Sequence, residues 1–191
     1  MHNFIIGIMG KKGSGKTELT KKALHNFPRV IILDILHEYE GVIFNDVDVL
    51  INFIKEYHEM QYIAVYRPLS DEKADKFFKL LNIIEDFVLI LEEADNWCDS
   101  KNIQPDLHKF LKYGRHGNRN VIWITRCPYE INRYLTRESD LIISFLQSEP
   151  RDLEYMKKYT TFNKEISKLK YYEYAYWTDY PDAEKLLNYF N

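Results

Sequence analysis

Cysteine, glycine and proline are all scarce in this sequence of 191 residues, which has two, seven and six of them. The two cysteines, Cys98 and Cys127, have no CxxC spacing and no histidine at metal-ligand spacing. This argues against a disulfide framework or a zinc site and favours ordinary thiols in a reducing compartment. The chain also has no internal repeat, low-complexity segment or Pro/Gly-rich linker.

Long apolar runs are missing too. The N-terminal Met1-His2-Asn3 leads directly into a short apolar run, without the charged region and long apolar stretch of a signal peptide. No apolar run approaches the roughly 20 residues that span a bilayer. We therefore expect a soluble, cytoplasmic protein that has no membrane span and is not secreted.

Charge of one sign is not in large excess, since 26 Lys and Arg face 29 Asp and Glu and the formal net charge is −3. This argues against a protein coated in basic surface but does not exclude a local basic patch. The hydrophobic fraction of 46% and the aromatic fraction of 15% argue against disorder. The 15 tyrosines could pack in a core or stack on bases, and composition does not choose between these.

Short apolar, β-branched runs alternate with longer amphipathic stretches. Runs that are apolar at consecutive positions are covered on both faces, which is typical of a parallel sheet under helices. The predicted strands are Phe4–Met9, Val30–Asp34, Tyr62–Tyr66, Phe87–Leu91, Val121–Thr125 and Leu141–Phe145. The predicted helices are Lys16–Asn26, Val47–His58, Asp71–Ile84 and Pro105–Tyr113. The alternation predicts an α/β domain of three layers with a mostly parallel central sheet.

Past Pro150 the pattern loosens. Residues 152–159 look helical, residues 168–177 could be an extra strand or hairpin, and residues 180–191 could be a short terminal helix. We expect residues 150–191 to form a C-terminal appendage of one domain that spans residues 1–191.

Residues 10–17 fit the phosphate-loop pattern G-x-x-x-x-G-K-[ST], with a predicted strand before them and a predicted helix after them. Glycines can adopt backbone angles that L-residues avoid, so successive N–H groups can point inward at an anion. The following helix adds the positive end of its dipole. Lys16 would place its charge on the β- and γ-phosphates of a nucleoside triphosphate, and the Thr17 hydroxyl would ligate magnesium.

The expected cofactors are therefore ATP and Mg²⁺. The expected nucleotide-binding residues are Gly10, Lys11, Lys12, Gly13, Ser14, Gly15, Lys16, Thr17 and Glu18. Among them, Ser14 would mainly shape the loop. Lys11 and Lys12 either face outward or add to the electrostatic attraction, and the sequence leaves both readings open.

A second acidic motif follows the apolar run Phe87–Leu91, where Glu92 and Glu93 come at its end. Open α/β sheets bind ligands at the carboxyl ends of their strands. We interpret Glu92 as the acid that holds magnesium through its water shell, and Glu93 as the general base that polarises the attacking water. The alternative is a solvated acidic turn that opens a helix, and Asp95 is the fallback acid. A pair of this kind suits hydrolysis better than a small-molecule kinase.

A glycine-flanked basic loop, residues 112–120, precedes the predicted strand Val121–Thr125, which ends in polar residues. The end of this strand would lie beside the γ-phosphate, with either Thr125 or Arg126 as its sensor. Further along, residues 135–145 contain another strand.

On these elements the chain resembles the FtsK–HerA superfamily of DNA-pumping ATPases, and most of all the small packaging ATPases of membrane-containing viruses and phages. The phosphate loop, the acid pair, the Gly114-Arg115-His116 turn, the strand ending before Pro128 and the stretch 137–145 occur in the family's order over residues 3–150. The chain departs from the family at Glu92, where Asp is usual, and at Arg126, where Gln is usual. The resemblance implies the ASCE/RecA-like class of three-layer P-loop NTPase.

The resemblance further implies an ATP-hydrolysing motor that translocates double-stranded DNA and packages a viral genome into a capsid. It implies a homo-oligomeric ring, usually a hexamer, in which a neighbour's arginine completes each ATP site. Arg115 is our first choice for this arginine finger and Arg119 the second, and each could instead be a surface arginine. Expected partners are double-stranded DNA and capsid or membrane-vertex proteins of a virion, in the host cytoplasm or on the virion.

Duplex DNA would be gripped through its phosphates, without a sequence code. The candidate basic residues stand among tyrosines near the C-terminus, and a solvated face is the alternative reading. They are Arg151, Lys157, Lys158, Lys164, Lys168 and Lys170, with Tyr159, Tyr171 and Tyr172.

Two other functions stay open. Nucleoside and nucleotide kinases are also small P-loop proteins, and Arg133 and Arg137 could form their phosphate-clamping lid, although the acid pair argues against it. The nucleotide domain of a phage assembly and export protein is the other, although that class normally carries a membrane segment.

Overall fold

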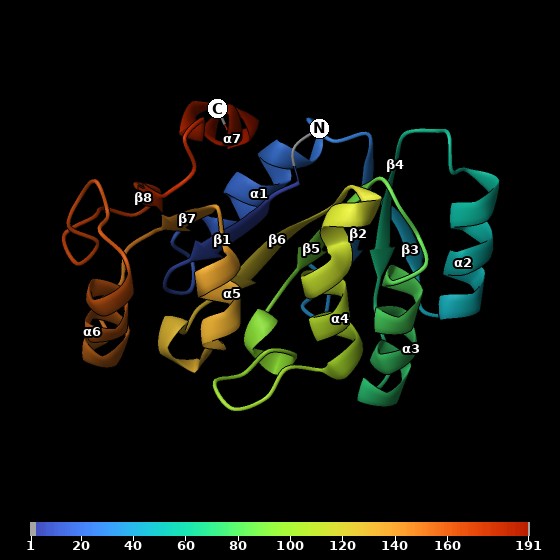
Figure 1. The fold of residues 1–191 in the computed structure, drawn as a ribbon, viewed down its shortest axis with the longest axis horizontal. Coiled ribbons are helices and arrows are strands. Elements are labelled where there is room, and N and C mark those ends of the chain that lie inside the picture. Colours follow the sequence, from blue (N-terminus) through green and yellow to red (C-terminus); the bar gives the residue numbers. More distant parts are fainter. Residues whose placement is uncertain (1–2, 191) are drawn as a thin grey trace.

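The computed structural model describes residues 3–190, without the side chains of residues 71–73 and 115. Its centre is one sheet of eight strands with helices on both faces (Figure 1). The strands are β1 Ile5–Met9, β2 Arg29–Leu33, β3 Val42–Phe44, β4 Tyr62–Tyr66, β5 Phe87–Leu91, β6 Arg119–Thr125, β7 Leu141–Ser144 and β8 Ala175–Thr178. The helices are α1 Lys16–Leu24, α2 Val47–Glu56, α3 Asp71–Leu81, α4 Pro105–Tyr113, α5 Arg133–Glu138, α6 Pro150–Tyr159 and α7 Ala183–Leu187.

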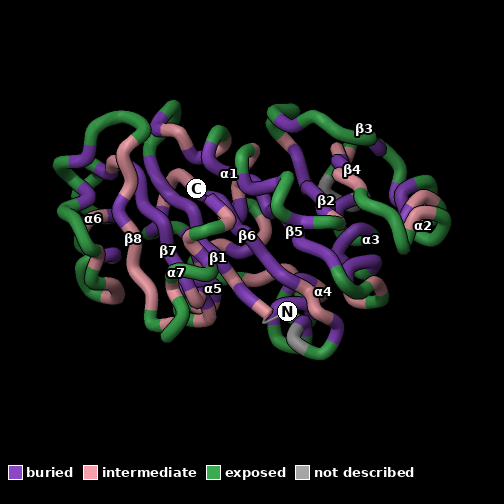
Figure 2. Tube along the Cα trace, turned by 90° about the horizontal axis from the view of Figure 1, so that it is seen from above, coloured by how far each residue is buried: buried purple, intermediate pink, exposed green. Residues whose placement is uncertain are grey.

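Apolar side chains on both faces of the strands make two separate cores. In β2, for example, Ile31 and Leu33 belong to the core under α2 to α6, while Val30 and Ile32 belong to the core under α1 and α7. Figure 2 shows the buried strands running between more exposed helices and loops. The predicted three-layer α/β fold is confirmed.

The strand order is β3-β4-β2-β5-β6-β1-β7-β8, and every neighbouring pair is parallel except β7 and β8. Strand β6 lies between β1 and β5, and Met9 of β1 is in register with Thr125 of β6. The carboxyl ends of β1, β5 and β6 therefore meet at one edge of the sheet, where the phosphate loop, the acid pair and the polar end of β6 begin.

The six predicted strands are all present, while β3 and α5 are additions that the sequence pattern did not reveal. Strand β3 has only three residues, two of them exposed at the edge of the sheet, so it shows no continuous apolar run. Helix α5 has six residues, too few to display a helical period. Three predicted helices end two or three residues early, at Leu24, Glu56 and Leu81.

Residues beyond 150 contribute to both cores and to the sheet. Strand β8 pairs with β7, Met156 of α6 lies in the first core, and Leu186 of α7 lies in the second. The backbone N–H of Tyr172 donates to the carbonyl of Ser14 at 3.0 Å, so this segment also contacts the phosphate loop. Asn191, the last residue of the predicted terminal helix, lies outside the described residues, as do Met1 and His2. Among the helices described in residues 3–190, none has the length and apolar character to cross a membrane.

Candidate active site

The phosphate loop connects β1 to α1 as the pattern predicts. Gly10 has a φ of 151°, and a Cβ there would lie 2.6 Å from Cβ of Phe145 and 2.8 Å from Oγ of Ser14. Glycine at this position is therefore required by both conformation and space. Gly13 and Gly15 also have positive φ values, of 74° and 115°, which turn the loop into the start of the helix.

Lys16 reaches back across its own loop. Its Nζ donates to the carbonyl of Gly10 at 2.7 Å and to that of Lys11 at 3.1 Å, and the side chain is buried. Burial lowers its pKa, as does the nearby charge of Arg126, while Glu92, Glu93 and Glu38 act in the opposite direction. The ammonium group is thus held at the mouth of the loop, in place for a phosphate oxygen.

Of the other predicted loop residues, three face solvent and Ser14 does not. Lys11 and Lys12 are exposed, which fits the outward-facing reading without deciding their contribution to phosphate attraction. Glu18 is exposed and lies 3.7 Å from Lys21 in an ion pair. Ser14 is buried, and its hydroxyl has no hydrogen-bond partner among the described residues.

Glu92 follows β5 and is 2% exposed. Its Oε1 accepts a hydrogen bond of 2.5 Å from the Tyr39 hydroxyl. Burial raises the pKa of Glu92 to about 7, with Glu38 and Glu93 adding to the rise and Tyr39 and Lys16 opposing it. A carboxylate this deeply desolvated favours a cation in its vicinity.

Glu93 forms an ion pair with Arg126, the residue that follows β6, at 2.7 Å. Burial raises the pKa of Glu93, and the Arg126 charge is the largest opposing influence. The backbone of Glu93 is left-handed, with a φ of 45°, and such strain in a non-glycine residue is typical of functional sites. Between the two sensor candidates, Thr125 is already engaged, because its hydroxyl donates to Asp95 at 2.7 Å. Arg126 is the one that reaches the acid pair.

Sequence reasoning missed Glu38 and Tyr39, which come from the loop after β2. Thr17 Oγ1 donates to Glu38 Oε2 at 2.9 Å, and Tyr39 donates to Glu92. The rule that ligands gather at strand ends would have found them only with the strand order, because β2 lies next to β5 in the sheet but far from it in sequence.

The two proposed finger arginines lie at the other edge of the sheet. Arg119 begins β6, and its guanidinium donates to the carbonyl of Ile84 at 2.7 Å and to that of Asn82 at 3.1 Å. These bonds hold the residues after α3, so the side chain contributes to the fold of its own chain. Arg115 lies in the turn 114–117, and its side chain is outside the described set.

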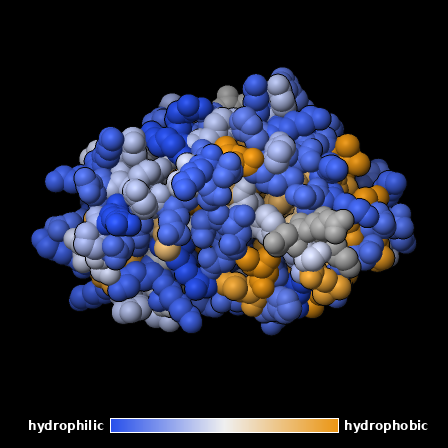
Figure 3. Space-filling view, turned by 90° about the horizontal axis from the view of Figure 1, so that it is seen from below, coloured by the Kyte–Doolittle hydropathy of each residue, from blue (hydrophilic) through white to orange (hydrophobic). Residues whose placement is uncertain are grey.

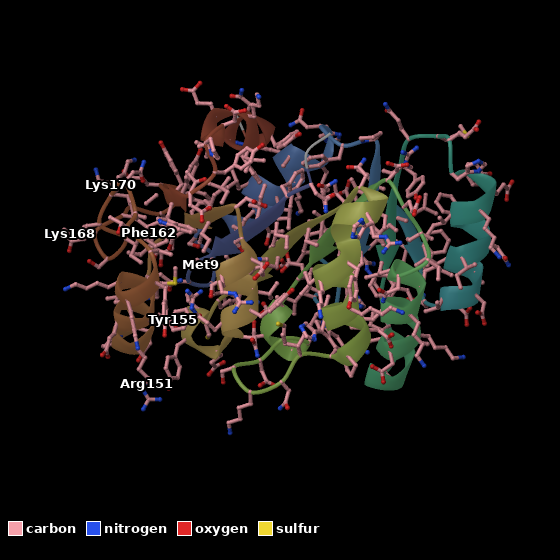
Figure 4. The ribbon with its side chains drawn as sticks, viewed as in Figure 1. Met9, Arg151, Tyr155, Phe162, Lys168 and Lys170 are labelled. Atoms are coloured by element: carbon pink, nitrogen blue, oxygen red, sulfur yellow. The ribbon has the colours of Figure 1, made fainter. Side chains whose placement is uncertain are left out.

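The candidate DNA residues do not form one uninterrupted patch. Lys164 pairs with Glu173 at 3.0 Å and Lys168 pairs with Glu165 at 2.7 Å. Figure 4 places Arg151 at the lower end of α6, and Lys168 and Lys170 in the loop above it. The face seen in Figure 3 is largely hydrophilic, with separate apolar areas.

The donor set fits magnesium bound together with a nucleotide. Thr17 and Glu92 offer the hydroxyl and carboxylate oxygens that this ion prefers, and Glu38 adds a third oxygen donor beside Thr17. Within residues 3–190, no group of three or more His, Cys, Asp or Glu side chains is gathered closely enough to hold a metal. Magnesium commonly binds through one or two protein oxygens, waters and substrate phosphates, which is what this site can supply.

Comparison with known proteins places this arrangement in context. No protein-family model and no curated protein matches the chain. Among solved structures, the genome packaging NTPase B204 of Sulfolobus turreted icosahedral virus 2, in complex with AMP, has a TM-score of 0.72 at 23% identity, over 92% of each chain. The DNA-packaging ATPase B204 of Sulfolobus turreted icosahedral virus has a TM-score of 0.68 at 22% identity, over 93% of this chain and 94% of that one.

This chain has the fold of a genome-packaging NTPase. The likeness covers 92% and 93% of this chain, which is more than the stretch 3–150 on which the sequence resemblance depends. The chain is less similar to the N-terminal domain of zonular occludens toxin from Neisseria meningitidis, with a TM-score of 0.51 at 17% identity over 78% of this chain and 80% of that one.

Proposed function

We propose that this chain is an ATPase that translocates double-stranded DNA and packages a viral genome into a capsid. One observation carries the proposal: Lys16, the acid pair Glu92-Glu93 and Arg126 converge at one sheet edge. Two further points support it, namely the likeness to packaging NTPases over 92% and 93% of the chain and the presence of a base candidate next to the magnesium candidate.

The residues would divide the work of hydrolysis. The loop amides and Lys16 bind the β- and γ-phosphates, while Thr17 and Glu92 hold the magnesium ion, which neutralises phosphate charge when bound. Glu93 takes a proton from water as the water oxygen bonds to the γ-phosphorus and the bond to the ADP oxygen breaks. The products are ADP and phosphate.

The ion pair between Glu93 and Arg126 would make hydrolysis depend on the γ-phosphate. While the two side chains are 2.7 Å apart, Arg126 occupies the carboxylate that must face water. A γ-phosphate offers Arg126 a second anion, so its movement to the phosphate would free Glu93. Arg126 then acts as the sensor, and ADP alone leaves the pair closed.

The oligomeric and DNA-binding parts of the proposal depend on residues other than those that carry hydrolysis. A homo-oligomeric ring, a hexamer in the simplest case, would bring a neighbour's arginine to each site. Arg115 remains the first choice, because Arg119 is occupied by backbone carbonyls of its own subunit. Duplex DNA would be held through its phosphates, and Arg151, Lys157, Lys158 and Lys170 are better candidates than the ion-paired Lys164 and Lys168. Capsid or membrane-vertex proteins would be the remaining partners.

The test is the ATPase rate across protein concentration, with and without duplex DNA. We expect a steep rise with concentration and stimulation by DNA, and no turnover in Glu93→Gln, which serves as the background control. Mixing the Glu93→Gln protein with the Arg115→Ala protein should restore some activity, because the first supplies the arginine finger and the second supplies the base. Phosphate that appears on a nucleoside monophosphate would instead establish a kinase. An ATPase rate per chain that changes with neither DNA nor protein concentration would rule out the ring motor.

A further inference from the structure

The loop between β2 and β3 brings an exposed carboxylate against the phosphate loop. Glu38 Oε2 accepts the hydrogen of Thr17 Oγ1 at 2.9 Å. The charge of Glu38 also reaches further into the site, because it contributes to raising the pKa of both Lys16 and Glu92. Glu38 therefore belongs to the same charge cluster as the residues predicted from sequence.

A buried ion pair fixes this loop in position. Asp34 is fully buried, lies 3.0 Å from the Arg67 guanidinium, and accepts the backbone N–H of Glu38 at 2.9 Å and that of Tyr39 at 3.2 Å. Arg67 also donates to the carbonyl of Tyr39 at 2.8 Å. The bonds tie the backbone at residues 38 and 39 to the ends of β2 and β4, so the backbone that carries the Glu38 side chain is fixed in position.

We propose that Glu38 is an additional residue of the magnesium site that orients the Thr17 hydroxyl. A hydroxyl has one hydrogen to donate and lone pairs to offer a cation. With the hydrogen held by Glu38, the lone pairs of Thr17 Oγ1 are left for the ion. The other nearby acid, Glu92, has a different partner, because its Oε1 accepts the hydrogen bond of the Tyr39 hydroxyl.

The inference rests on the proposed function, because it requires a magnesium-bound nucleotide at the loop. Residues that orient a metal ligand change metal affinity by about 10- to 100-fold when they are removed. The negative charge of Glu38 opposes phosphate and attracts a divalent cation. Its loss should therefore weaken magnesium binding without weakening nucleotide binding in the absence of magnesium.

The experiment titrates Mg²⁺ into the full chain in the presence of a fluorescent ADP analogue, and repeats analogue binding in EDTA. Glu38→Ala should raise the Mg²⁺ concentration at half-saturation by about tenfold. Glu38→Gln keeps an acceptor oxygen for the Thr17 hydrogen and should raise the Mg²⁺ concentration at half-saturation by less. Glu40→Gln is the matched control, since Glu40 is an exposed acid two residues away, and it should behave like the unmodified chain.

A double-mutant cycle with Thr17→Val isolates the contact. Once the hydroxyl is absent, Glu38→Ala should lose the part of its effect that acts through Thr17, so the two changes together should shift the Mg²⁺ midpoint by less than the sum of their separate effects. Additive effects, or equal weakening of analogue binding with and without magnesium, would overturn the role of Glu38. If the unmodified chain shows no magnesium-dependent ADP binding at all, the proposed function itself fails, before any variant is compared.

Discussion

Replacing Glu92 with glutamine should stabilise the nucleotide-free protein at alkaline pH and have little effect near pH 4.5. Burial raises the pKa of the Glu92 carboxyl from 4.5 to about 7, and the hydrogen bond from Tyr39 opposes the rise only in part. The folded chain thus binds this proton more tightly than the unfolded chain does. The carboxylate form is the one that folding disfavours.

The sign and size follow from linkage. Because the unfolded chain releases this proton near pH 4.5 and the folded chain near pH 7, stability falls as the pH rises through that window and is level above it. One pKa unit corresponds to roughly 1.4 kcal/mol, so the difference between 4.5 and about 7 corresponds to about 3 kcal/mol. Glutamine has the same shape, keeps an acceptor oxygen for Tyr39 and has no proton to release.

The assay is urea unfolding between pH 4.5 and 8 in EDTA, with the unmodified chain, Glu92→Gln and the exposed control Glu40→Gln. Other titrating groups occur in all three chains and largely cancel in the differences. The stability of Glu92→Gln relative to the unmodified chain should rise by about 3 kcal/mol towards pH 8, and that of the control should stay flat. A difference for Glu92→Gln that varies by less than about 0.5 kcal/mol would refute the claim that this carboxylate is desolvated.

Three further changes test other parts of the structure. Glu93→Gln should keep ATP binding and lower single-turnover hydrolysis by about 10²- to 10⁴-fold, the usual contribution of a general base, and unchanged turnover would remove Glu93 from that role. Gly7→Ala should lower the free energy of unfolding by about 1–3 kcal/mol, because the new Cβ would lie 2.3 Å from the Trp123 ring; an unchanged denaturation midpoint would contradict this. Arg119→Ala should destabilise the fold by about 1–3 kcal/mol, since it leaves two backbone carbonyls without their charged donor. A finger role for Arg119 instead predicts normal stability and lost turnover, so measuring both quantities separates the two.

The parts of the fold that could be predicted are those whose causes are local. Three elements have the predicted bounds, namely Tyr62–Tyr66, Phe87–Leu91 and Pro105–Tyr113. The two strands are apolar along their length because both of their faces are covered, and the helix begins at a proline, which is favoured in the first turn of a helix. Strand β3 escaped prediction because it is stabilised by pairing with β4 and hardly at all by its own composition. Its partner is separated from it by a whole helix.

The same distinction applies to the site. The phosphate loop needs a fixed spacing of glycines within eight residues, so a short pattern reveals it. Glu38 and Tyr39 reach the site only because β2 is next to β5 and because Arg67, 33 residues after Asp34, clamps the loop between them. A local sequence pattern does not reveal contacts between residues that are this far apart in the chain. Arg119 shows the same dependence on neighbours: its basic character suggested a finger, which stays a prediction, and only the structure shows that its guanidinium contacts backbone carbonyls.

The balance of charge at the site favours a magnesium-bound nucleotide over a free one. Three carboxylates, of Glu38, Glu92 and Glu93, lie near two cations, Lys16 and Arg126, and the charges of the other four all influence the pKa of Lys16. Burial raises the pKa of Glu92, and the charges of Glu38 and Glu93 add to the rise. A free triphosphate would add further negative charge to a site that already holds its acids with difficulty, whereas a divalent cation reverses the balance and lets Glu92 ionise. Under the proposed function, the acids therefore favour binding of the nucleotide together with the metal ion over binding of the free nucleotide.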